Sequence, residues 1–580
     1  PTTPTAVMPP SLRADAGPAG ESSNTLGMRR ILLALLLLLA GVVALPSASA
    51  VPAPEDYAYT DSWFTSYDGT QLHAGVFLPA DSRPGEKHPV LLVSTPYTAP
   101  GGGATGGAQL DEGPVIRFPE LFEHPAFLRG RYAYVQVDVR GFGGSGGCFG
   151  YYLEPEKQDV KVAVEWAATQ KWSTGKVGTW GKSYDAAQQV LALAAKPKGL
   201  AAQVIQAPGL SAYTALWMNG VHYATGRYAT TGVYTADDLM PPQNAGSVAS
   251  PEYAAAAVSA ATVDPTCRTD AVVRMNTEGD RSGEFWKGKE PYLGARGSRI
   301  PTFWSHGFFD ANTKPVHLDV WSSLKGPKQA WFGQYTHLRG HEQGVGREGF
   351  NDEAFRFLDR YVRGVRTAQD PAVTVQSGNG EGRWRAEKAW PPADGRRWAL
   401  PLRAGSYVDE PGNNGDGSSA GLGHWTATRP LPYAAHLAGE VQLTAKVSTV
   451  APGAQVVAHV YDVDADGVAT LVTRGAAVAR TTGAQDVAYA LYPQDWVFEK
   501  GHRIAVHLSA ADDAWFSPGV TQTEVTVTGG SASFPLLSQR RTRFLAGDES
   551  DGTLNDSPFP VDAATLEEAT VAALPPRQKG

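Results

Sequence analysis

One short segment of this 580-residue chain constrains its fold more than any other. The apolar run 177–180 leads into the motif Gly-Lys-Ser-Tyr at 181–184, and residues 185–195 carry the pattern of a helix rich in Ala and Leu. A strand, a sharp turn built on Gly and Ser, and a helix form the nucleophile elbow of an α/β-hydrolase. The turn lifts the hydroxyl of Ser183 above the sheet edge, and the helix N-terminus behind it supplies free backbone N–H groups for an oxyanion.

Two residues further along the chain complete a candidate catalytic triad with Ser183. Asp310 closes the segment 303–310 and His337 closes the segment 332–337, each soon after a predicted strand. Because a serine hydroxyl is a poor nucleophile at neutral pH, a neutral imidazole must take its proton, and an aspartate must orient that imidazole. The chain order Ser, Asp, His is the one expected for this fold and differs from the chymotrypsin and subtilisin orders. The sequence therefore predicts a serine hydrolase.

A second histidine and a second aspartate compete for these roles. His341 lies four residues after His337, and Asp319 lies inside a predicted helix. His337 is the preferred base because it comes sooner after the preceding strand, whereas His341 could cap or line the loop. Asp310 is the preferred acid because it follows a strand, as the serine does, so that all three groups emerge along one edge of the sheet.

Strand and helix patterns alternate through most of the first half of the chain. Two β-rich runs on either side of Asp68-Gly69 predict a hairpin. Short runs dense in apolar residues, typical of strands buried on both faces, alternate with helices that carry one apolar stripe. This alternation predicts a mostly parallel sheet flanked by helices. The predicted strands are 61–67, 70–78, 88–94, 132–138, 176–180, 201–205, 300–305 and 328–332, and the predicted helices are 155–170, 185–195, 315–324 and 350–362.

The alternation stops between residue 209 and about residue 299, where aromatic residues are frequent. We expect this insertion to form a helical cap over the active site, because sites favour concave apolar clefts at domain junctions; a helical appendage that only packs is the alternative. After residue 370, alternating apolar and polar residues separated by Gly and Pro clusters predict an antiparallel β-sandwich of the jelly-roll type. The expected organisation is an α/β-hydrolase domain over 51–370, the sandwich over 371–545 and an irregular tail over 546–580.

The first 50 residues are not expected to belong to the fold. Residues 1–27 are rich in Pro, Ala, Gly and Ser and predict a disordered lead. The basic start at 28–30, the apolar run 31–45 and an Ala-x-Ala pattern predict a secretory signal peptide that is cleaved after Ala50. Because the apolar run is shorter than the ~20 residues of a membrane span, we expect a secreted protein without stable membrane insertion.

Composition and spacing bear on partners and cofactors. A net charge of −8 and the lack of a basic stripe argue against a nucleic-acid partner. No Cys and His constellation predicts a metal site, and no cofactor is expected. Residues 462–467 begin like a calcium loop, but its twelfth position is Thr473, so a hairpin turn is the preferred interpretation. Cys148 and Cys267 could form a disulfide outside the cell or stay separate thiols, and the oligomeric state is left open.

The oxyanion of the predicted reaction needs two hydrogen-bond donors. The backbone N–H of Tyr184, directly after the nucleophile, is the first. Tyr97, in Ser-Thr-Pro-Tyr after an early strand, carries a phenol that could be the second. A tyrosine after a strand packs more often than it donates, so the residues alone leave this role open.

The chain carries four motifs in a characteristic layout: LLVSTPY at 91–97, DVRGFGGS at 138–145, GKSY at 181–184 and HGFFDANTKP at 306–315. Together with the order of hydrolase core, cap and jelly roll, they resemble the X-Pro dipeptidyl-peptidase and cocaine-esterase family of serine hydrolases over residues 57–540. The resemblance implies that Ser183 is the nucleophile, Asp310 the acid and His337 the base. It also implies that Tyr97 donates to the oxyanion. One position departs from the family, which usually has Gly where this chain has Ala186.

The resemblance implies two related reactions. The leading prediction is a secreted peptidase that releases X-Pro dipeptides from free N-termini through an acyl-enzyme on Ser183. An esterase or acylase of the same fold, acting on acyl or α-amino-acid esters, is the alternative. The sequence of the motif at 306–315 and the presence of Lys182 favour the peptidase. A non-catalytic surface or glycan-binding protein is a third possibility, against which the complete triad argues.

Overall fold

The computed structural model describes most of the chain beyond its N-terminal region. The described residues are 54–98, 108–109, 115–152, 154–224, 250–253, 255–256, 271, 273–379, 383–412, 422–519, 521–548, 550 and 558–579. The predicted lead and signal peptide lie outside them. Cys148 is disulfide-bonded, but Cys267 also lies outside the described residues, so their pairing stays a prediction. Among the described residues, no helix combines the length and the apolar character that a membrane span requires.

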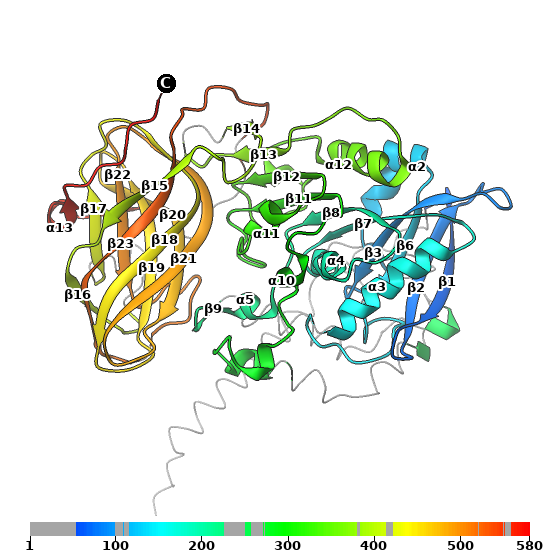
Figure 1. The fold of residues 1–580 in the computed structure, drawn as a ribbon, viewed down its shortest axis with the longest axis horizontal. Coiled ribbons are helices and arrows are strands. Elements are labelled where there is room, and N and C mark those ends of the chain that lie inside the picture. The colour runs from blue at the N-terminus through cyan, green and yellow to red at the C-terminus, as the bar shows by residue number, and fades with distance from the viewer. Residues whose placement is uncertain are drawn as a thin grey trace, which may run out of the picture. The chain divides into compact units, whose positions relative to one another are not determined.

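The N-terminal half of the described chain is built around a ten-stranded sheet (Figure 1). Its spatial order is β1-β2-β6-β3-β7-β8-β11-β12-β13-β14. The strands between β6 and β13 pair in parallel, while β1, β2 and β14 add antiparallel edges, so the predicted mostly parallel sheet is confirmed. The strands are β1 (Tyr57–Thr65), β2 (Gln71–Pro79), β3 (His88–Thr95), β6 (Ala133–Asp138), β7 (Ser173–Lys182), β8 (Leu200–Gln206), β11 (Thr302–Gly307), β12 (Lys328–Gly333), β13 (Val373–Gln376) and β14 (Trp384–Glu387).

Helices cover both faces of this sheet, which explains why its central strands are apolar at successive positions. Alternate residues of β3 belong to different buried clusters. One cluster includes the apolar stripe of α3 (Glu154–Thr169), and the other includes Trp180 of β7 and the apolar face of α12 (Phe350–Leu358). Between β7 and β8 runs α4 (Tyr184–Ala195), which packs against α3. The elbow segment therefore has the strand and the helix that its sequence predicts.

Two boundaries differ from the sequence prediction. The helix expected over 315–324 is limited to α11 (Asp319–Ser323), because Lys314 and His317 adopt left-handed backbone angles that no α-helix contains. The main sheet also continues past residue 370, where we expected the β-sandwich to begin, since β13 and β14 still pair with β12. Four-residue strands carry too little periodicity to be assigned to one sheet or the other from sequence.

The insertion between β8 and β11 contains several short elements whose bounds the structure gives. These are α5 (Ala212–Leu216), β9 (Trp217–Met218), β10 (Val221–His222), η3 (Glu284–Trp286) and α10 (Pro291–Ala295). The described residues 251–253, 255–256, 271 and 273–277 are also helical. Tyr213 and Trp286 of this insertion belong to the same buried cluster as Tyr97 and Tyr184. The insertion therefore packs against the residues next to Ser183; that it covers the active site stays a prediction, and we call it the cap below.

The C-terminal part is a β-sandwich, as predicted. One sheet has the order β15-β23-β18-β21 with β16 beside β23, and the other has the order β24-β20-β19-β22-β17-β25. Alternate residues of both sheets form one buried cluster between them. The strands are β15 (Gly395–Pro401), β16 (Gly405–Val408), β17 (His424–Thr428), β18 (Ala435–Thr449), β19 (Gln455–Val463), β20 (Val468–Val478), β21 (Gly483–Phe498), β22 (Arg503–Ser509) and β23 (Glu524–Leu537).

The tail that we predicted to be irregular is partly ordered, so that prediction was wrong for its second half. Residues 559–571 form β24 (Phe559–Pro560), α13 (Ala563–Ala569) and β25 (Thr570–Val571), and both short strands extend the second sheet. Leu566 of α13 packs into a cluster on that sheet. Two-residue strands have no readable period, so the sequence could not reveal them.

The segment 462–467 is a hairpin turn, as predicted, because it connects the antiparallel strands β19 and β20. Asp464 Oδ1 accepts hydrogen bonds from the backbone N–H groups of Asp466 and Val468, both at 2.9 Å. Gly467 adopts a φ of 83°, which closes the turn. The side chain of Asp464 therefore serves the turn itself.

Candidate active site

Ser183 occupies the sharp turn between β7 and α4. Its backbone angles are φ 65° and ψ −124°, a strained conformation for a residue with a side chain. The turn is held by a hydrogen bond from the Ser183 backbone N–H to the carbonyl of Gln206 on β8, at 3.0 Å. A Cβ atom on Gly181 would lie 2.7 Å from the backbone of Asp185, so only glycine lets α4 begin so close to the strand.

Ala186, the position at which this chain departs from the family pattern, lies at the same helix–strand contact. Its side chain is fully buried and shares a cluster with Val190 and with Ile205 of the neighbouring strand. The methyl group therefore fills space that the fold provides. The elbow therefore accommodates Ala at this position.

The predicted base and acid are in contact. His337 Nδ1 lies 2.8 Å from Asp310 Oδ2. Asp310 is fully buried and accepts hydrogen bonds from the backbone N–H groups of Asn312 (2.8 Å) and Thr313 (3.0 Å) and from the Thr313 hydroxyl (2.8 Å). Burial alone would raise the pKa of Asp310, but the neighbouring His337 and His306 hold it well below its usual range. Asp310 is therefore an ionised carboxylate that orients the His337 ring.

The imidazole of His337 is kept neutral at physiological pH. Burial lowers its pKa below the usual value and outweighs the attraction of Asp310, and the ammonium of Lys182 lowers the pKa further. With Nδ1 directed at Asp310, the other ring nitrogen is available to accept a proton. A neutral imidazole in this tautomer is the form that a general base requires.

The competing residues lie elsewhere. His341 Nε2 is 3.9 Å from Glu120 Oε1, and Asp319 forms an ion pair with Arg296 on a partly exposed surface. Neither contacts the Asp310–His337 pair among the described contacts. The structure thus brings His337 and Asp310 into contact and places His341 and Asp319 elsewhere.

Both predicted oxyanion donors lie beside the Ser183 hydroxyl. The Tyr97 hydroxyl donates to Ser183 Oγ at 3.2 Å and accepts a hydrogen bond from the Tyr184 backbone N–H at 3.4 Å. The guanidinium of Arg117 lies 4.4 Å above the Tyr97 ring, and its Nε donates to Asp185 at 2.7 Å. Tyr97 is therefore held in place by packing, and its hydroxyl is directed at the candidate nucleophile.

One contact of a complete triad is not formed in this state. Within the described residues, Ser183 Oγ has no hydrogen bond to His337. Such bonds are often long or poorly aligned without substrate and tighten only when it binds. Here the Tyr97 hydroxyl donates its hydrogen bond to Ser183 Oγ. A substrate carbonyl would have to replace Ser183 Oγ as the acceptor of that hydrogen bond.

The sequence did not reveal the residue that supports Tyr184 from behind. Glu156 of α3 is fully buried and accepts hydrogen bonds from the Tyr184 hydroxyl (2.8 Å), Gln188 (3.0 Å) and the Tyr152 backbone N–H (3.0 Å). Burial raises the pKa of Glu156 to about 7. A signal existed, because Glu156 precedes Val160 by four residues and therefore lies on the apolar stripe of the helix.

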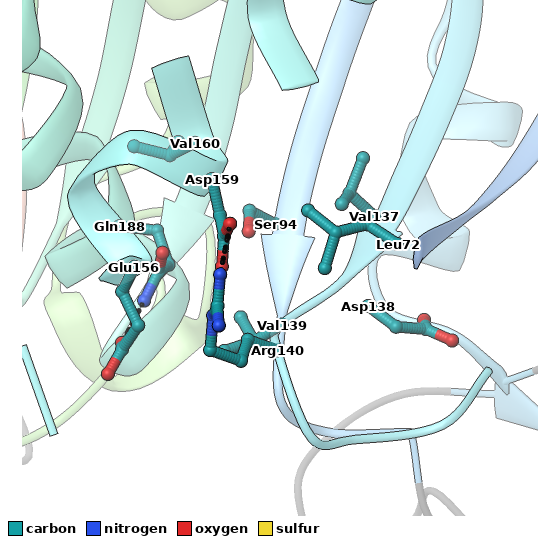
Figure 2. Close-up of a pocket in the computed structure, with 10 residues that line it drawn as sticks. All are labelled: Leu72, Ser94, Val137, Asp138, Val139, Arg140, Glu156, Asp159, Val160 and Gln188. Carbon is teal, nitrogen blue, oxygen red and sulfur yellow. Dashed lines mark hydrogen bonds and ion pairs between the residues drawn. The ribbon is translucent and has the colours of Figure 1, made fainter. Parts of the chain in front are cut away.

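Glu156 also lines a small cavity in front of α3 and α4. Figure 2 shows Glu156 and Gln188 on one side, the Arg140–Asp159 ion pair in the middle and Leu72, Val137 and Asp138 on the other side. Its volume of about 10 Å³ is enough for one water molecule at most. The cavity is therefore a small packing gap beside Glu156 and Gln188, and it is too small for a substrate.

Lys314, from the motif at 306–315, is a second residue whose contacts the sequence could not reveal. Its ammonium is fully buried and donates to the carbonyls of Ala215 (3.0 Å) and Asn312 (3.1 Å). It also lies 4.2 Å from the centre of the Tyr223 ring. Lys314 thereby ties the loop that follows Asp310 to the cap.

Among the described residues, no group of His, Cys, Asp and Glu side chains could hold a metal ion. The chemistry that these side chains offer is that of a serine, an imidazole and oriented N–H and O–H donors. Together with the parallel sheet and the elbow, this arrangement defines a hydrolase of the α/β class.

Comparison with known protein families agrees with this class. Residues 68–339 match the family model "X-Pro dipeptidyl-peptidase (S15 family)", and residues 365–555 match the model "X-Pro dipeptidyl-peptidase C-terminal non-catalytic domain". The chain therefore belongs to the X-Pro dipeptidyl-peptidase (S15) family of serine hydrolases.

Curated relatives are similar along most of the chain. A "Putative Xaa-Pro dipeptidyl-peptidase" of Streptomyces avermitilis is 24% identical and aligns with 85% of this chain and 78% of its own length. A "Putative serine esterase" of Mycobacterium tuberculosis is 22% identical, with 82% of this chain and 94% of its own length aligned. Relatives of similar distance thus carry names from both branches of the family.

Solved structures share the fold. An aminopeptidase from the archaeon Thaumarchaeota archaeon has a TM-score of 0.63 at 16% identity, and the match covers 85% of this chain and 99% of that one. An α-amino acid ester hydrolase has the same TM-score at 18% identity and the same coverage. At these identities the likeness establishes the fold alone.

Proposed function

We propose that this protein is a secreted X-Pro dipeptidyl-peptidase that acts through an acyl-enzyme on Ser183. The observation that carries the proposal is the position of the Ser183 hydroxyl at 3.2 Å from the Tyr97 phenol, next to the Tyr184 N–H, on the same sheet edge as the Asp310–His337 pair. A nucleophile, an oriented base and two oxyanion donors are the parts that acyl transfer needs.

The reaction follows from these positions. Ser183 Oγ attacks the carbonyl carbon of the second residue of the substrate, and His337 takes the hydroxyl proton. The carbonyl oxygen becomes an oxyanion that accepts hydrogen bonds from the Tyr97 hydroxyl and the Tyr184 N–H. His337 then returns the proton to the leaving amine as the C–N bond breaks. Water, deprotonated by His337, hydrolyses the ester on Ser183 and releases the dipeptide.

The aromatic cluster beside the elbow supports a compact apolar residue next to the scissile bond. Tyr97, Tyr184, Tyr213 and Trp286 belong to this cluster, which joins the catalytic core to the cap. These side chains are buried, and an aromatic environment of this kind beside the scissile bond is compatible with a proline ring. The peptidase names of several relatives point in the same direction.

The test compares three substrates: Ala-Pro-p-nitroanilide, its N-acetylated form, which lacks only the free amine, and the simple ester p-nitrophenyl butyrate. A peptidase that binds the free amine should cleave Ala-Pro-p-nitroanilide far faster than the other two compounds. Blocking the amine would leave the group of the enzyme that binds it unpaired. Equal or faster cleavage of the acetylated peptide or of the simple ester would assign the protein to the esterase branch. No labelling of Ser183 by a fluorophosphonate would reject both activities.

Secretion is the second part of the proposal, and it rests on the pattern at residues 28–50. Expression in a bacterium with an intact export pathway should place activity outside the cytoplasm. N-terminal sequencing of the exported protein should begin at Val51. Activity confined to the cytoplasm, with residues 28–50 retained, would contradict this part without affecting the enzymatic one.

A further inference from the structure

A second cavity lies where the cap, the loop after Asp310 and the β-sandwich meet. Its volume is about 290 Å³, and none of the candidate triad or oxyanion residues line it. Trp217 comes from the cap, His317 from the loop after Asp310, and Leu491 from β21 of the sandwich. A cavity of this size at a junction of three parts of a molecule has the usual character of a small-molecule site.

One carboxylate in the wall of this cavity lacks a protein partner. Glu440 stands at the bulge of β18, and its side chain forms no hydrogen bond or ion pair with the residues that the structure describes. Arg397 donates to the backbone carbonyl of Glu440 instead, at 2.9 Å. Burial, aided by the negative charge of Asp319, raises the pKa of Glu440 to about 7 against the opposing effect of Arg397 and Arg296. A cationic group in the cavity would supply the missing partner.

Arg281, which lines the same cavity, carries unused hydrogen-bond donors. Arg281 is fixed by Glu290, which accepts from Nε at 2.6 Å and from Nη2 at 2.9 Å, and Nη2 also donates to the Tyr292 hydroxyl at 2.7 Å. Within the described part of the chain, Nη1 of Arg281 has no acceptor, so its two N–H groups remain available. A second guanidinium, that of Arg296, also lines the cavity and is paired with Asp319.

The charges select the ligand class. A simple amine would meet Glu440 but would leave the Nη1 donors of Arg281 without an acceptor, and a simple anion would meet Arg281 but leave Glu440 unpaired. A molecule with an ammonium at one end and a carboxylate at the other satisfies both. The walls between these groups include Trp217 and Leu491, which suit an apolar side chain or a proline ring.

We propose that this cavity binds a small zwitterion, a free amino acid or a dipeptide, with its ammonium at Glu440 and its carboxylate at Arg281. The ligand connects the β-sandwich to the cap, because Glu440 belongs to the first and Arg281 to the second. This proposal does not depend on the proposed peptidase activity, since it rests on the charges and the shape of a cavity that Ser183 does not line.

Calorimetry on the full protein tests the proposal, after Ser183 has been modified with a fluorophosphonate so that the catalytic site is blocked. L-alanyl-L-proline should bind at one site per chain. N-acetyl-alanyl-proline lacks the ammonium and alanyl-proline amide lacks the carboxylate, so each should bind at least about tenfold more weakly. Absence of binding by the dipeptide, or equal binding of all three compounds, overturns the proposal.

Two substitutions locate the site. Glu440→Gln removes the charge with little change in shape and should weaken L-alanyl-L-proline binding by about tenfold or more. Glu524→Gln, an exposed position of the same sandwich that does not line the cavity, serves as the matched control and should leave binding unchanged. Ala490→Trp, from the wall of the cavity, should abolish binding by filling it. Equal affinity in Glu440→Gln and the control shows that the dipeptide binds elsewhere and rejects the proposal, whatever the outcome of the peptidase assay.

Discussion

Two fully buried aspartates of this protein are held in different ways. Asp310, at the carboxyl edge of the sheet, contacts the ring of His337 and receives main-chain N–H groups. Asp495, on β21, receives two hydrogen bonds from the guanidinium of Arg385 on β14, at 2.9 and 2.6 Å, and one contact from His436 at 2.8 Å. Arg385 and Asp495 thereby connect the main sheet to the β-sandwich; we call them the interdomain pair.

The difference lies in the partner. Despite burial, which alone would raise both, the pKa of each aspartate is held below its usual range, chiefly by His337 for Asp310 and by Arg385 for Asp495. Arginine keeps its charge at every physiological pH, so the interdomain pair cannot change state during a reaction. The imidazole of His337 is neutral at rest and can take a proton, which Asp310 then stabilises. A buried aspartate thus stabilises the fold where its partner is a permanent cation, as in Asp495, and can take part in catalysis where its partner titrates, as in Asp310.

The largest expected effect separates the chemistry from the fold. Ser183→Ala should reduce kcat on the order of 10⁶-fold, because nothing else attacks the carbonyl carbon. The melting temperature should not fall, since the substitution by alanine removes none of the contacts that stabilise the sheet. Ser322→Ala, on the exposed face of α11, is the control and should keep full activity. Turnover and thermal unfolding measured on the same samples check both statements, and turnover of Ser183→Ala close to that of the unmodified enzyme would exclude Ser183 as the nucleophile.

The second prediction tests the two aspartates directly. Asp310→Asn should lower kcat by about 10⁴-fold, because the amide favours the wrong tautomer of His337. Asp495→Asn should leave kcat of the folded enzyme unchanged but reduce the free energy of unfolding by about 3 kcal/mol or more, because Arg385 loses its charged partner in a buried position.

Urea unfolding and initial rates on both variants give a two-by-two comparison. The assignment fails if Asp495→Asn loses activity as steeply as Asp310→Asn while remaining folded. It also fails if Asp310→Asn retains activity near that of the unmodified enzyme.

The two aspartates also show what sequence can reveal. Asp310 was predictable because it follows a strand and stands in the expected order after the serine, and parallel strands bring their carboxyl ends to one edge. Asp495 was not, because its partner lies 110 residues away in the chain and only the docking of two domains brings them together. Glu156 lies between these cases, since its place on an apolar stripe was visible but its contact with Tyr184 was not.

The third prediction concerns the oxyanion. Tyr97→Phe removes one donor and should lower kcat by about 10² to 10³-fold with little change in KM. Tyr132→Phe is a suitable control, because it removes another buried hydroxyl of the same domain, which donates to Asp359 at 2.9 Å. The control should lose some stability and no activity. An unchanged kcat in Tyr97→Phe would return this residue to a packing role.

The smallest effect is a shift in pH dependence, and it examines why the catalytic imidazole stays neutral. The ammonium of Lys182 lowers the pKa of His337, while its own pKa is lowered by burial to about 8, so Lys182 is charged over the acidic range in which His337 titrates. A base works only when deprotonated, so kcat/KM falls as the pH drops through the pKa of His337. Lys182→Gln removes a positive charge that opposes the imidazolium, so the pKa of His337 rises and the acidic limb of the profile moves to higher pH.

Lys176→Gln, an exposed position on the same strand, is the control and should leave the profile in place. A profile of Lys182→Gln that coincides with the control, or moves to lower pH, would show that burial alone sets the protonation of His337.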